Sequence, residues 1–391
     1  MKERLWVRAG TLYTPRCAFR SVTVVARAGL IQSILPGDAI DPAPGDVVID
    51  AREHIVAPGL IDIHVHGGGG YDTMDATAEA LDGLAAFHAG HGTTALLPST
   101  VAAPAEEIHR VLEAIAEAMA RPPVGARILG AHVEGPFLNP TRRGAHLEQY
   151  VRPADRARDD WLNEHQAAIR RITLAPELPG ALELIRDLRA AGIVVSLGHA
   201  APDEEVLDQA VMAGASHVTH LFNAMSSMEK VGPLRRPGLA EMALVCDGLT
   251  VEVIGDGNHL PFAVVRLVVR AKGAERVALV TDAMRAAGLP DGRYQLGEMG
   301  VTVQGGMAVT DEGGLAGSIA TMDQLVRNAV EQVGLPLAQA LEMGTLTPAR
   351  ILGIDGQQGE IAVGKAADLV VLNQKLEVVA TIVDGQVVHS A

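Results

Sequence analysis

The chain has few cysteines, few aromatic residues and no long run of basic residues, and these shortages exclude two classes of protein. Its 391 residues include only two cysteines, so a scaffold built on several disulfides is excluded. Aromatic residues make up 3% of the chain, the formal net charge is −15, and no long basic run occurs. Nucleic-acid binding needs clustered positive charge and stacking aromatics, so we expect no nucleic-acid partner.

Long apolar segments are lacking as well. The longest stretch free of Asp, Glu, Lys and Arg is 83–105, and histidines, glycines, two prolines and several hydroxyl residues interrupt it. A membrane span needs about 20 mostly apolar residues, so we expect no membrane partner and a cytoplasmic location. Apolar residues nevertheless form 48% of the chain, enough for a folded core.

The two ends of the chain share one pattern. Residues 1–57 and 350–391 contain short strand-like segments separated by turn signals such as Pro-Gly and Asp-Gly. Neither end holds enough alternating strand to bury a core alone. We therefore predict a small β-sandwich domain that is discontinuous in sequence and is formed by both termini.

Residues 58–349 change to apolar strands alternating with amphipathic helices. The expected strands are 60–66, 93–100, 127–134, 172–175, 193–197, 217–222, 250–254 and 276–281, and examples of the helices are 105–120, 181–191, 203–213 and 261–272. This alternation predicts an α/β fold with a (β/α)8 TIM-type barrel. A doubly wound sheet is the alternative, but no G-x-G-x-x-G follows the first strand. The segment 292–311 predicts a β insertion after the eighth strand.

Active sites of such barrels lie at the carboxyl ends of the strands. The first expected strand ends in Asp62-Ile63-His64-Val65-His66, where period-2 alternation places His64 and His66 on one face. Two imidazoles on a rigid strand can converge on one divalent cation, whereas a buried pair of structural histidines is the competing interpretation. The glycines at 67–70 let the backbone approach a ligand closely.

Four other strand ends carry ionisable groups. The residues are Glu134, His199, His220 and Asp282. Glu134 is costly to bury unless it is paired with an arginine or binds a metal. His217 and His220 differ by three positions, so we expect only His220 to point inward from a strand, and we place His132 one layer below Glu134. Together with His64 and His66, these groups predict a site for one or two divalent ions, Zn²⁺, Fe²⁺, Co²⁺ or Mn²⁺.

Two loop histidines extend the expected site. His146 and His259 each follow a barrel strand, so substrate contact is expected for both, with solvated loop residues as the alternative. The other histidines outside the strand ends are interpreted as surface or packing residues; they are His54, His88, His91, His109, His165 and His389.

These residues carry a specific resemblance. The segment 58–67 is similar to the first-strand motif of the amidohydrolase superfamily, and 359–370 is similar to its return into the β-sandwich. Most members place a carboxylated lysine where this chain has Glu134, in His-Val-Glu-Gly-Pro-Phe-Leu-Asn at 132–139. That variant, with the motifs at 197–199, 219–225, 280–283 and 315–318, closely resembles the N-acetylglucosamine-6-phosphate deacetylases.

The resemblance implies metal-dependent hydrolysis of the acetamide of N-acetyl-D-glucosamine 6-phosphate, giving glucosamine 6-phosphate and acetate. It implies Glu134, His199 and His220 as ligands of an essential metal, with His64 and His66 at a second ion. It makes Asp282, near both ions, the proton acceptor and donor. His146 would orient or polarise the carbonyl.

Substrate contacts follow from the same resemblance. It assigns the phosphate to backbone N–H groups of Asn223 and Ala224 and to an arginine before Pro-Gly. Arg235 is the positional match and Arg236 a substitute, because the family's Arg-Glu-Pro-Gly is Arg-Arg-Pro-Gly here. His259 would contact sugar hydroxyls or phosphate, and Leu315, Ala316 and Gly317 would border the substrate.

The resemblance also implies a homodimer in which the loop arginine reaches the neighbouring site. Two alternatives remain open: another amidohydrolase acting on a different N-acyl or cyclic amide, and a non-catalytic relative. A non-catalytic relative would be expected to have lost metal-binding side chains, yet all six of the expected positions still carry His, Glu or Asp.

Overall fold

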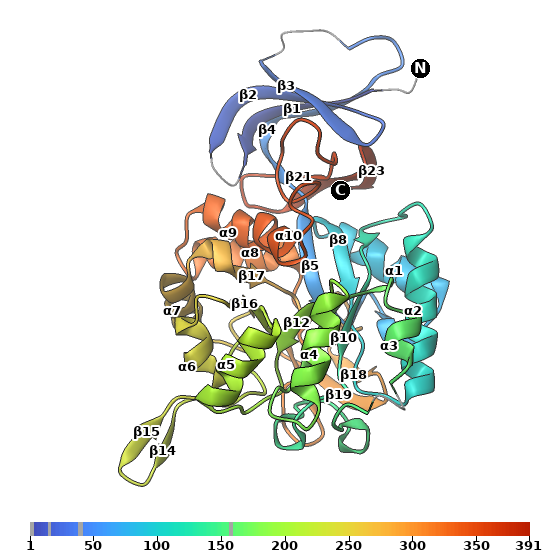
Figure 1. Cartoon of the computed structure of the whole chain (residues 1–391). Coiled ribbons are helices and arrows are strands. Elements are labelled where there is room, and N and C mark those ends of the chain that lie inside the picture. Colours follow the sequence, from blue (N-terminus) through green and yellow to red (C-terminus); the bar gives the residue numbers. More distant parts are fainter. Residues whose placement is uncertain (1–3, 15–16, 38–41, 156–158) are drawn as a thin grey trace.

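The computed structural model describes residues 4–14, 17–37, 42–155 and 159–391. Figure 1 shows two units. A sheet that contains both the blue N-terminal and the red C-terminal strands lies above a larger unit of alternating strands and helices.

The two chain ends share one seven-stranded sheet. Its strands are β1 (Arg4–Tyr13), β2 (Ala18–Arg27), β3 (Leu30–Pro36), β4 (Val47–Pro58), β21 (Leu369–Leu372), β22 (Val378–Val383) and β23 (Gln386–Ser390). The order is β23-β22-β21-β4-β1-β2-β3, so β21 from the C-terminal end pairs with β4 from the N-terminal end. The predicted Asp-Gly hairpin turn is present, with Asp384 and Gly385 both at positive φ. The shared sheet agrees with the expected discontinuous unit, whereas the second layer of a sandwich stays a prediction.

The larger unit is built on parallel strands. One sheet joins β5 (Leu60–Val65), β8 (Thr93–Pro98) and β9 (Arg127–Ile128). The other joins β10 (Ala131–Glu134), β11 (Ile169–Leu174), β12 (Val194–Leu197), β13 (His217–Val218), β16 (Thr250–Val253) and β17 (Val277–Leu279). Two isolated parallel bridges connect these sheets, Ser99 with His132 and Val65 with Ala283. The carboxyl ends of all these strands therefore face the same way.

Helices cover the strands, and their bounds follow the apolar pattern. They are α1 (Ala78–Ala89), α2 (Ala105–Met119), α3 (Trp161–Glu164), α4 (Ala181–Ala190), α5 (Glu204–Ala213), α6 (Leu239–Val245), α7 (Phe262–Lys272), α8 (Met322–Glu331), α9 (Leu337–Gly344) and α10 (Leu346–Ile351). In α2 the buried residues Ile108, Val111, Leu112 and Ile115 recur at spacings of three and four. Within the described ranges, no helix combines the length and apolarity that crossing a bilayer requires.

Several predicted strands are shorter than expected, and in two of them a residue at positive φ divides or ends the strand. The strand 127–134 is divided into β9 and β10 at Gly130, whose φ is 146° and where a Cβ would lie 2.6 Å from the Ala168 carbonyl oxygen. The strand 217–222 ends at Val218, because His220 and Phe222 adopt φ values of 26° and 74°.

Small β elements border the carboxyl ends of the strands. The predicted insertion is a three-stranded antiparallel sheet of β18 (Gly292–Leu296), β19 (Met299–Gln304) and β20 (Met307–Thr310). The hairpin of β14 (Glu229–Val231) and β15 (Leu234–Arg236) projects from the lower edge of the unit in Figure 1. The pair β6 (Gly67–Gly68) and β7 (Tyr71–Asp72) and the short helices η1 (Thr73–Asp75), η2 (Pro140–Arg142), η3 (Glu148–Tyr150) and η4 (Ala274–Arg276) complete the elements.

Candidate metal centre

Six ionisable side chains meet at the carboxyl ends of the strands. His64 and Glu134 belong to β5 and β10, and the others follow the ends of β5, β12, β13 and β17: they are His66, His199, His220 and Asp282. Each of them is at most 6% exposed. The structure thus brings together the six groups that the sequence analysis placed in one site.

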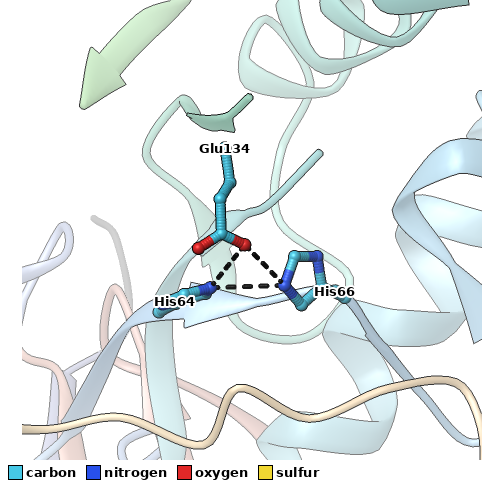
Figure 2. Close-up of side chains that lie close together, drawn as sticks. All are labelled: His64, His66 and Glu134. Atoms are coloured by element: carbon cyan, nitrogen blue, oxygen red, sulfur yellow. Dashed lines mark hydrogen bonds and ion pairs between the residues drawn. The ribbon is translucent and has the colours of Figure 1, made fainter. Parts of the chain in front are cut away.

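Glu134 lies at the centre of this cluster, and its carboxylate contacts two pairs of histidines. Its Oε2 lies 3.3 Å from His64 Nε2 and 3.2 Å from His66 Nε2. Figure 2 marks both contacts with dashed lines. Its Oε1 lies 3.3 Å from Nε2 of both His199 and His220. Each carboxylate oxygen therefore faces a different pair of imidazoles, the arrangement expected of a carboxylate that can bridge two cations.

The hydrogen bonds of the histidines turn their lone pairs inward. The Nδ1–H of His66 donates to the Ser99 carbonyl at 3.2 Å, and that of His199 donates to the Arg142 carbonyl at 2.9 Å. His64 Nδ1 lies 2.7 Å from Glu252 Oε1. A neutral histidine carries one N–H, so the Nε2 atoms of these rings face the Glu134 carboxylate as acceptors. Acceptors facing acceptors repel unless positive charge lies between them.

Spacing and unsatisfied atoms fit a divalent cation. The Nε2 atoms of His64 and His66 are 3.2 Å apart, and those of His199 and His220 are 3.0 Å apart. Two nitrogens that bind one tetrahedral Zn²⁺ at about 2.0–2.1 Å lie roughly 3.3 Å from each other. Glu134 Oε1 is buried without a hydrogen-bond partner in the described residues. Nitrogen and carboxylate donors at these separations fit Zn²⁺ or a similar transition metal.

The local charge also favours positive charge at this position. Burial alone would lower the pKa of His66, but the carboxylates of Asp282 and Glu134 raise it to about 9. Burial likewise opposes the charged form of His64, yet the same two carboxylates raise its pKa well above the usual value. The carboxylates thus stabilise positive charge at this position, whether it is supplied by protons or by metal ions.

His146 differs from the ligands in its hydrogen bonding. Its Nδ1 accepts the Ala102 backbone N–H at 3.0 Å, so its proton resides on Nε2, which lies 3.7 Å from Glu134 Oε2. Burial, together with the nearby charge of His199, lowers its pKa to about 3. A neutral imidazole with an N–H directed into the site can donate to a carbonyl oxygen.

Backbone strain is concentrated in the same residues. His199, His220 and Asp282 adopt φ values of 50°, 26° and 48°, which β-region strands do not visit. Neighbouring backbone groups hold two of these turns: Asn139 N–H donates to the His199 carbonyl, and Asp282 N–H donates to the His64 carbonyl. Strain retained at three of the six clustered residues is typical of a functional site.

A polar layer beneath the ligands was missed by sequence reasoning. Arg171 and Glu252 are fully buried, and Arg171 Nη1 lies 2.6 Å from Glu252 Oε2. Glu252 Oε1 also accepts the backbone N–H of His220. The available signal was charge inside an apolar strand, from Arg170 and Arg171 within 169–174 and from Glu252 within 250–253. The deeper position of His132 is confirmed: it is buried between Ser99 and Thr173, 2.9 and 2.7 Å from their hydroxyls.

The expectation for His217 was wrong. Both His217 and His220 lie inside the unit, since His217 Nε2 is 3.2 Å from Glu252 Oε2. Strand alternation does not apply, because the strand ends at Val218 and the left-handed turn at His220 redirects its side chain. His220 remains the residue that meets Glu134.

A cavity of about 450 Å³ opens onto the centre. Of the expected substrate contacts, those that line it are His146, Asn223, Ala224, His259, Leu315 and Gly317. Ala316 is buried behind the lining, and Arg235 and Arg236 lie outside it, exposed on β15. The Asn223 N–H already donates to the His220 carbonyl, which leaves Ala224 as the better backbone candidate.

The six histidines left outside the site do not line this cavity. His88 is fully buried and its Nε2–H donates to the Gly67 carbonyl at 3.0 Å, which fixes the loop after β5. Burial lowers the pKa of His88 to about 4. His88 therefore has a packing role and is not part of the cavity, in agreement with the sequence interpretation.

Comparisons with known proteins agree with this geometry. The family model described as "Amidohydrolase family" matches residues 55–388. An N-acetylgalactosamine-6-phosphate deacetylase of Escherichia coli O157:H7 is 40% identical, over 89% of this chain and 91% of that protein. An N-acetylglucosamine-6-phosphate deacetylase of Bacillus subtilis is 36% identical over 99% and 98% of the two chains.

A solved structure is similar over its whole length. The N-acetyl-D-glucosamine-6-phosphate deacetylase of Mycobacterium smegmatis, a mutant in complex with N-acetyl-D-glucosamine-6-phosphate, is 34% identical. The alignment covers 99% of this chain and 100% of that one, with a TM-score of 0.90. Sequence motifs, strand-end ligands and overall structure all agree, and the chain belongs to the amidohydrolase family.

Proposed function

We propose that this protein hydrolyses the acetamide of N-acetyl-D-glucosamine 6-phosphate to D-glucosamine 6-phosphate and acetate. The observation that carries the proposal is Glu134, whose two oxygens face separate histidine pairs on the floor of the cavity. Relatives named for this activity match nearly the full length of the chain. Apart from N-acetylgalactosamine 6-phosphate, for which one of the relatives is named, they do not favour a different N-acyl or cyclic amide substrate.

A metal is part of the proposal. Glu134, His199 and His220 would hold one ion, and His64 and His66 would hold a second, with Glu134 between them and Asp282 beside His66. When bound, a divalent cation such as Zn²⁺, Fe²⁺, Co²⁺ or Mn²⁺ polarises an amide carbonyl and lowers the pKa of water.

Asp282 is the group that moves the proton. Burial alone would raise its pKa, but His64 and His66 lower it to about 2, so its carboxylate is ionised at neutral pH. Its Oδ1 lies 3.1 Å from His66 Nε2 at the cavity wall. Asp282 would accept a proton from the attacking water and then donate it to the departing amine, while His146 Nε2–H donates to the carbonyl oxygen.

The sugar and phosphate would occupy the side of the cavity beyond β13 and β16. Ala224 follows β13 there, and His259 follows β16, with its Nδ1 held 2.9 Å from Asp256. Arg235 lies on an exposed hairpin outside the cavity of its own chain. We therefore propose a homodimer in which Arg235, or Arg236 in its place, reaches the phosphate in the neighbouring subunit.

The proposal also covers the domain architecture of the chain. Bridges at both sheet edges support a single (β/α)8 barrel over 58–349, with residues 1–57 and 350–391 as the second domain. Such a barrel places the proposed ligands on rigid strand ends.

A second candidate substrate is N-acetylgalactosamine 6-phosphate, because the relative named for that activity is 40% identical. Acetate release from both sugar phosphates should be measured with the protein loaded with Zn²⁺, Fe²⁺, Co²⁺ or Mn²⁺. N-acetylglucosamine without phosphate is the control for phosphate recognition. Activity on N-acetylglucosamine 6-phosphate that Asp282→Asn abolishes is expected. Good turnover of a cyclic imide with none of either sugar phosphate would contradict the proposal.

A further inference from the structure

A second cavity lies directly behind the wall of the catalytic one. It has a volume of about 250 Å³ and lies between the β18–β19 turn and the loops that follow β8 and β10. The two cavities share four lining residues, Val101, Ala145, His146 and Leu296. The side chains of Val101 and Leu296 are the large apolar members of this shared wall.

The wall is tightly packed. Val101 is 7% exposed and Leu296 is 4% exposed, and both belong to one buried apolar cluster. A Cβ added at Gly297 would lie 2.7 Å from Val101 Cγ2, so the hairpin turn is pressed against Val101. Without a side chain at 297, Leu296 and Val101 close the gap between the cavities.

Hydrogen bonds hold the turn in this position. Tyr150 Oη donates to Glu298 Oε2 at 3.0 Å, and Arg285 Nε donates to the Gln295 carbonyl at 3.0 Å. The residues on both sides of Leu296 are thereby tied to other parts of the molecule. The partition is a fixed surface rather than a loose side chain.

The wall stands where the acyl group of a bound amide would point. The carbonyl carbon must lie near Glu134 and the N–H of His146. The amide nitrogen of the substrate is bonded to the sugar, which would lie on the side of Ala224 and His259, after β13 and β16. The carbonyl carbon also carries the acyl chain, which is its third substituent after the oxygen and the nitrogen. This chain therefore extends away from Ala224 and His259, toward β5 and β8, and Val101 follows β8.

We propose that Val101 and Leu296 form the wall that limits the length of the acyl chain in this enzyme. They admit an acetyl group and exclude longer acyl chains from the cavity behind them. The inference rests on the proposed function, since it assumes an N-acyl amino-sugar phosphate as the substrate. An apolar wall of this kind discriminates by roughly 10- to 200-fold for each methylene.

The test compares kcat/KM for the N-acetyl, N-propionyl and N-butyryl forms of glucosamine 6-phosphate with the metal-loaded full chain. The wild type should lose at least about tenfold with each added methylene. Leu296→Ala and Val101→Ala should each raise the butyryl-to-acetyl ratio about tenfold or more. The ratio is measured within one sample, so a lower fraction of folded protein does not change it.

Val303→Ala is the matched control. Val303 is buried in the same apolar cluster on β19 but lines neither cavity, so its truncation loosens the hairpin without opening the wall. It should keep the wild-type ratio. The inference is overturned if the wild type accepts butyryl as readily as acetyl, if neither wall variant changes the ratio, or if Val303→Ala changes it equally. A wild type that releases no acetate would instead overturn the proposed function.

Discussion

Nδ1 of His64 lies 2.7 Å from Oε1 of Glu252, and both side chains are fully buried. The same oxygen accepts the backbone N–H of His220, while the other oxygen of Glu252 meets Arg171 at 2.6 Å. Burial alone would raise the pKa of Glu252, but Arg171 and His64 lower it well below its usual value. One carboxylate below the site therefore orients a histidine from each of the two pairs around Glu134.

Glu252→Gln should weaken metal binding. The amide retains the size of the side chain but loses the charge that orients His64, and loss of such supporting partners costs roughly 10- to 100-fold in metal affinity. Metal content after dialysis against graded chelator concentrations measures the effect. Asp323→Asn is the matched control, because Asp323 is also buried and paired with an arginine and a histidine, but on α8. Equal metal loss in both variants would contradict the positioning role of Glu252.

The six residues whose meeting the sequence predicted share one property. Each of the six groups ends a strand, and parallel strands place their carboxyl ends on one edge, so their meeting follows from the alternation of strands and helices. His132 was also placed correctly, because it lies two residues before Glu134 on the same face of β10.

The layer of Arg171 and Glu252 could not be predicted in the same way. Their pairing depends on which strands lie opposite each other, and the sequence separation is 81 residues. The inward position of His217 depends on a backbone turn, the φ of 26° at His220, that no local pattern announces. Register and strained dihedrals arise from tertiary packing, and they decide where these side chains point.

His146→Leu should lower kcat and leave the metal content unchanged. Nδ1 of His146 is occupied by the Ala102 N–H, so its contribution is the Nε2–H donor, and removal of one such donor costs roughly 10²- to 10³-fold. Steady-state kinetics with metal analysis of the same sample tests this. His259→Gln provides the comparison, since a sugar or phosphate contact should raise KM instead. Loss of metal in His146→Leu would identify His146 as a ligand.

Arg235→Ala should raise KM for the phosphorylated substrate by roughly 10- to 100-fold, the size expected for a charge-assisted hydrogen bond. Its KM for N-acetylglucosamine without phosphate should not change. Arg236→Ala, one residue along the same exposed strand, is the control and should have the smaller effect. Because Arg235 lies outside its own cavity, sedimentation of the active protein should show a dimer. Full activity in a monomer would contradict the role of the arginine in the neighbouring site.

Asp368→Asn should stabilise the protein at neutral pH. Asp368 lies between the two units, where its Oδ1 accepts the Asp384 N–H and Arg127 Nη2 is 3.6 Å away. Burial, only partly offset by Arg127, raises its pKa to about 6 from 3.8. An acid with a raised folded-state pKa contributes stability below pH 3.8 that is lost as the pH rises through 6, about 3 kcal/mol in full. The asparagine keeps the acceptor and cannot ionise.

Thermal unfolding of both proteins at pH 5 and pH 7.5 measures this difference. The advantage of Asp368→Asn should grow between the two values, because the wild type loses stability over that interval. Asp311→Asn is the control: the exposed Asp311 pairs with Arg293, which lowers its pKa, so its ionisation is complete below pH 5. A stability difference between Asp368→Asn and the wild type that does not change with pH would mean that Asp368 does not titrate in this interval, contrary to the prediction.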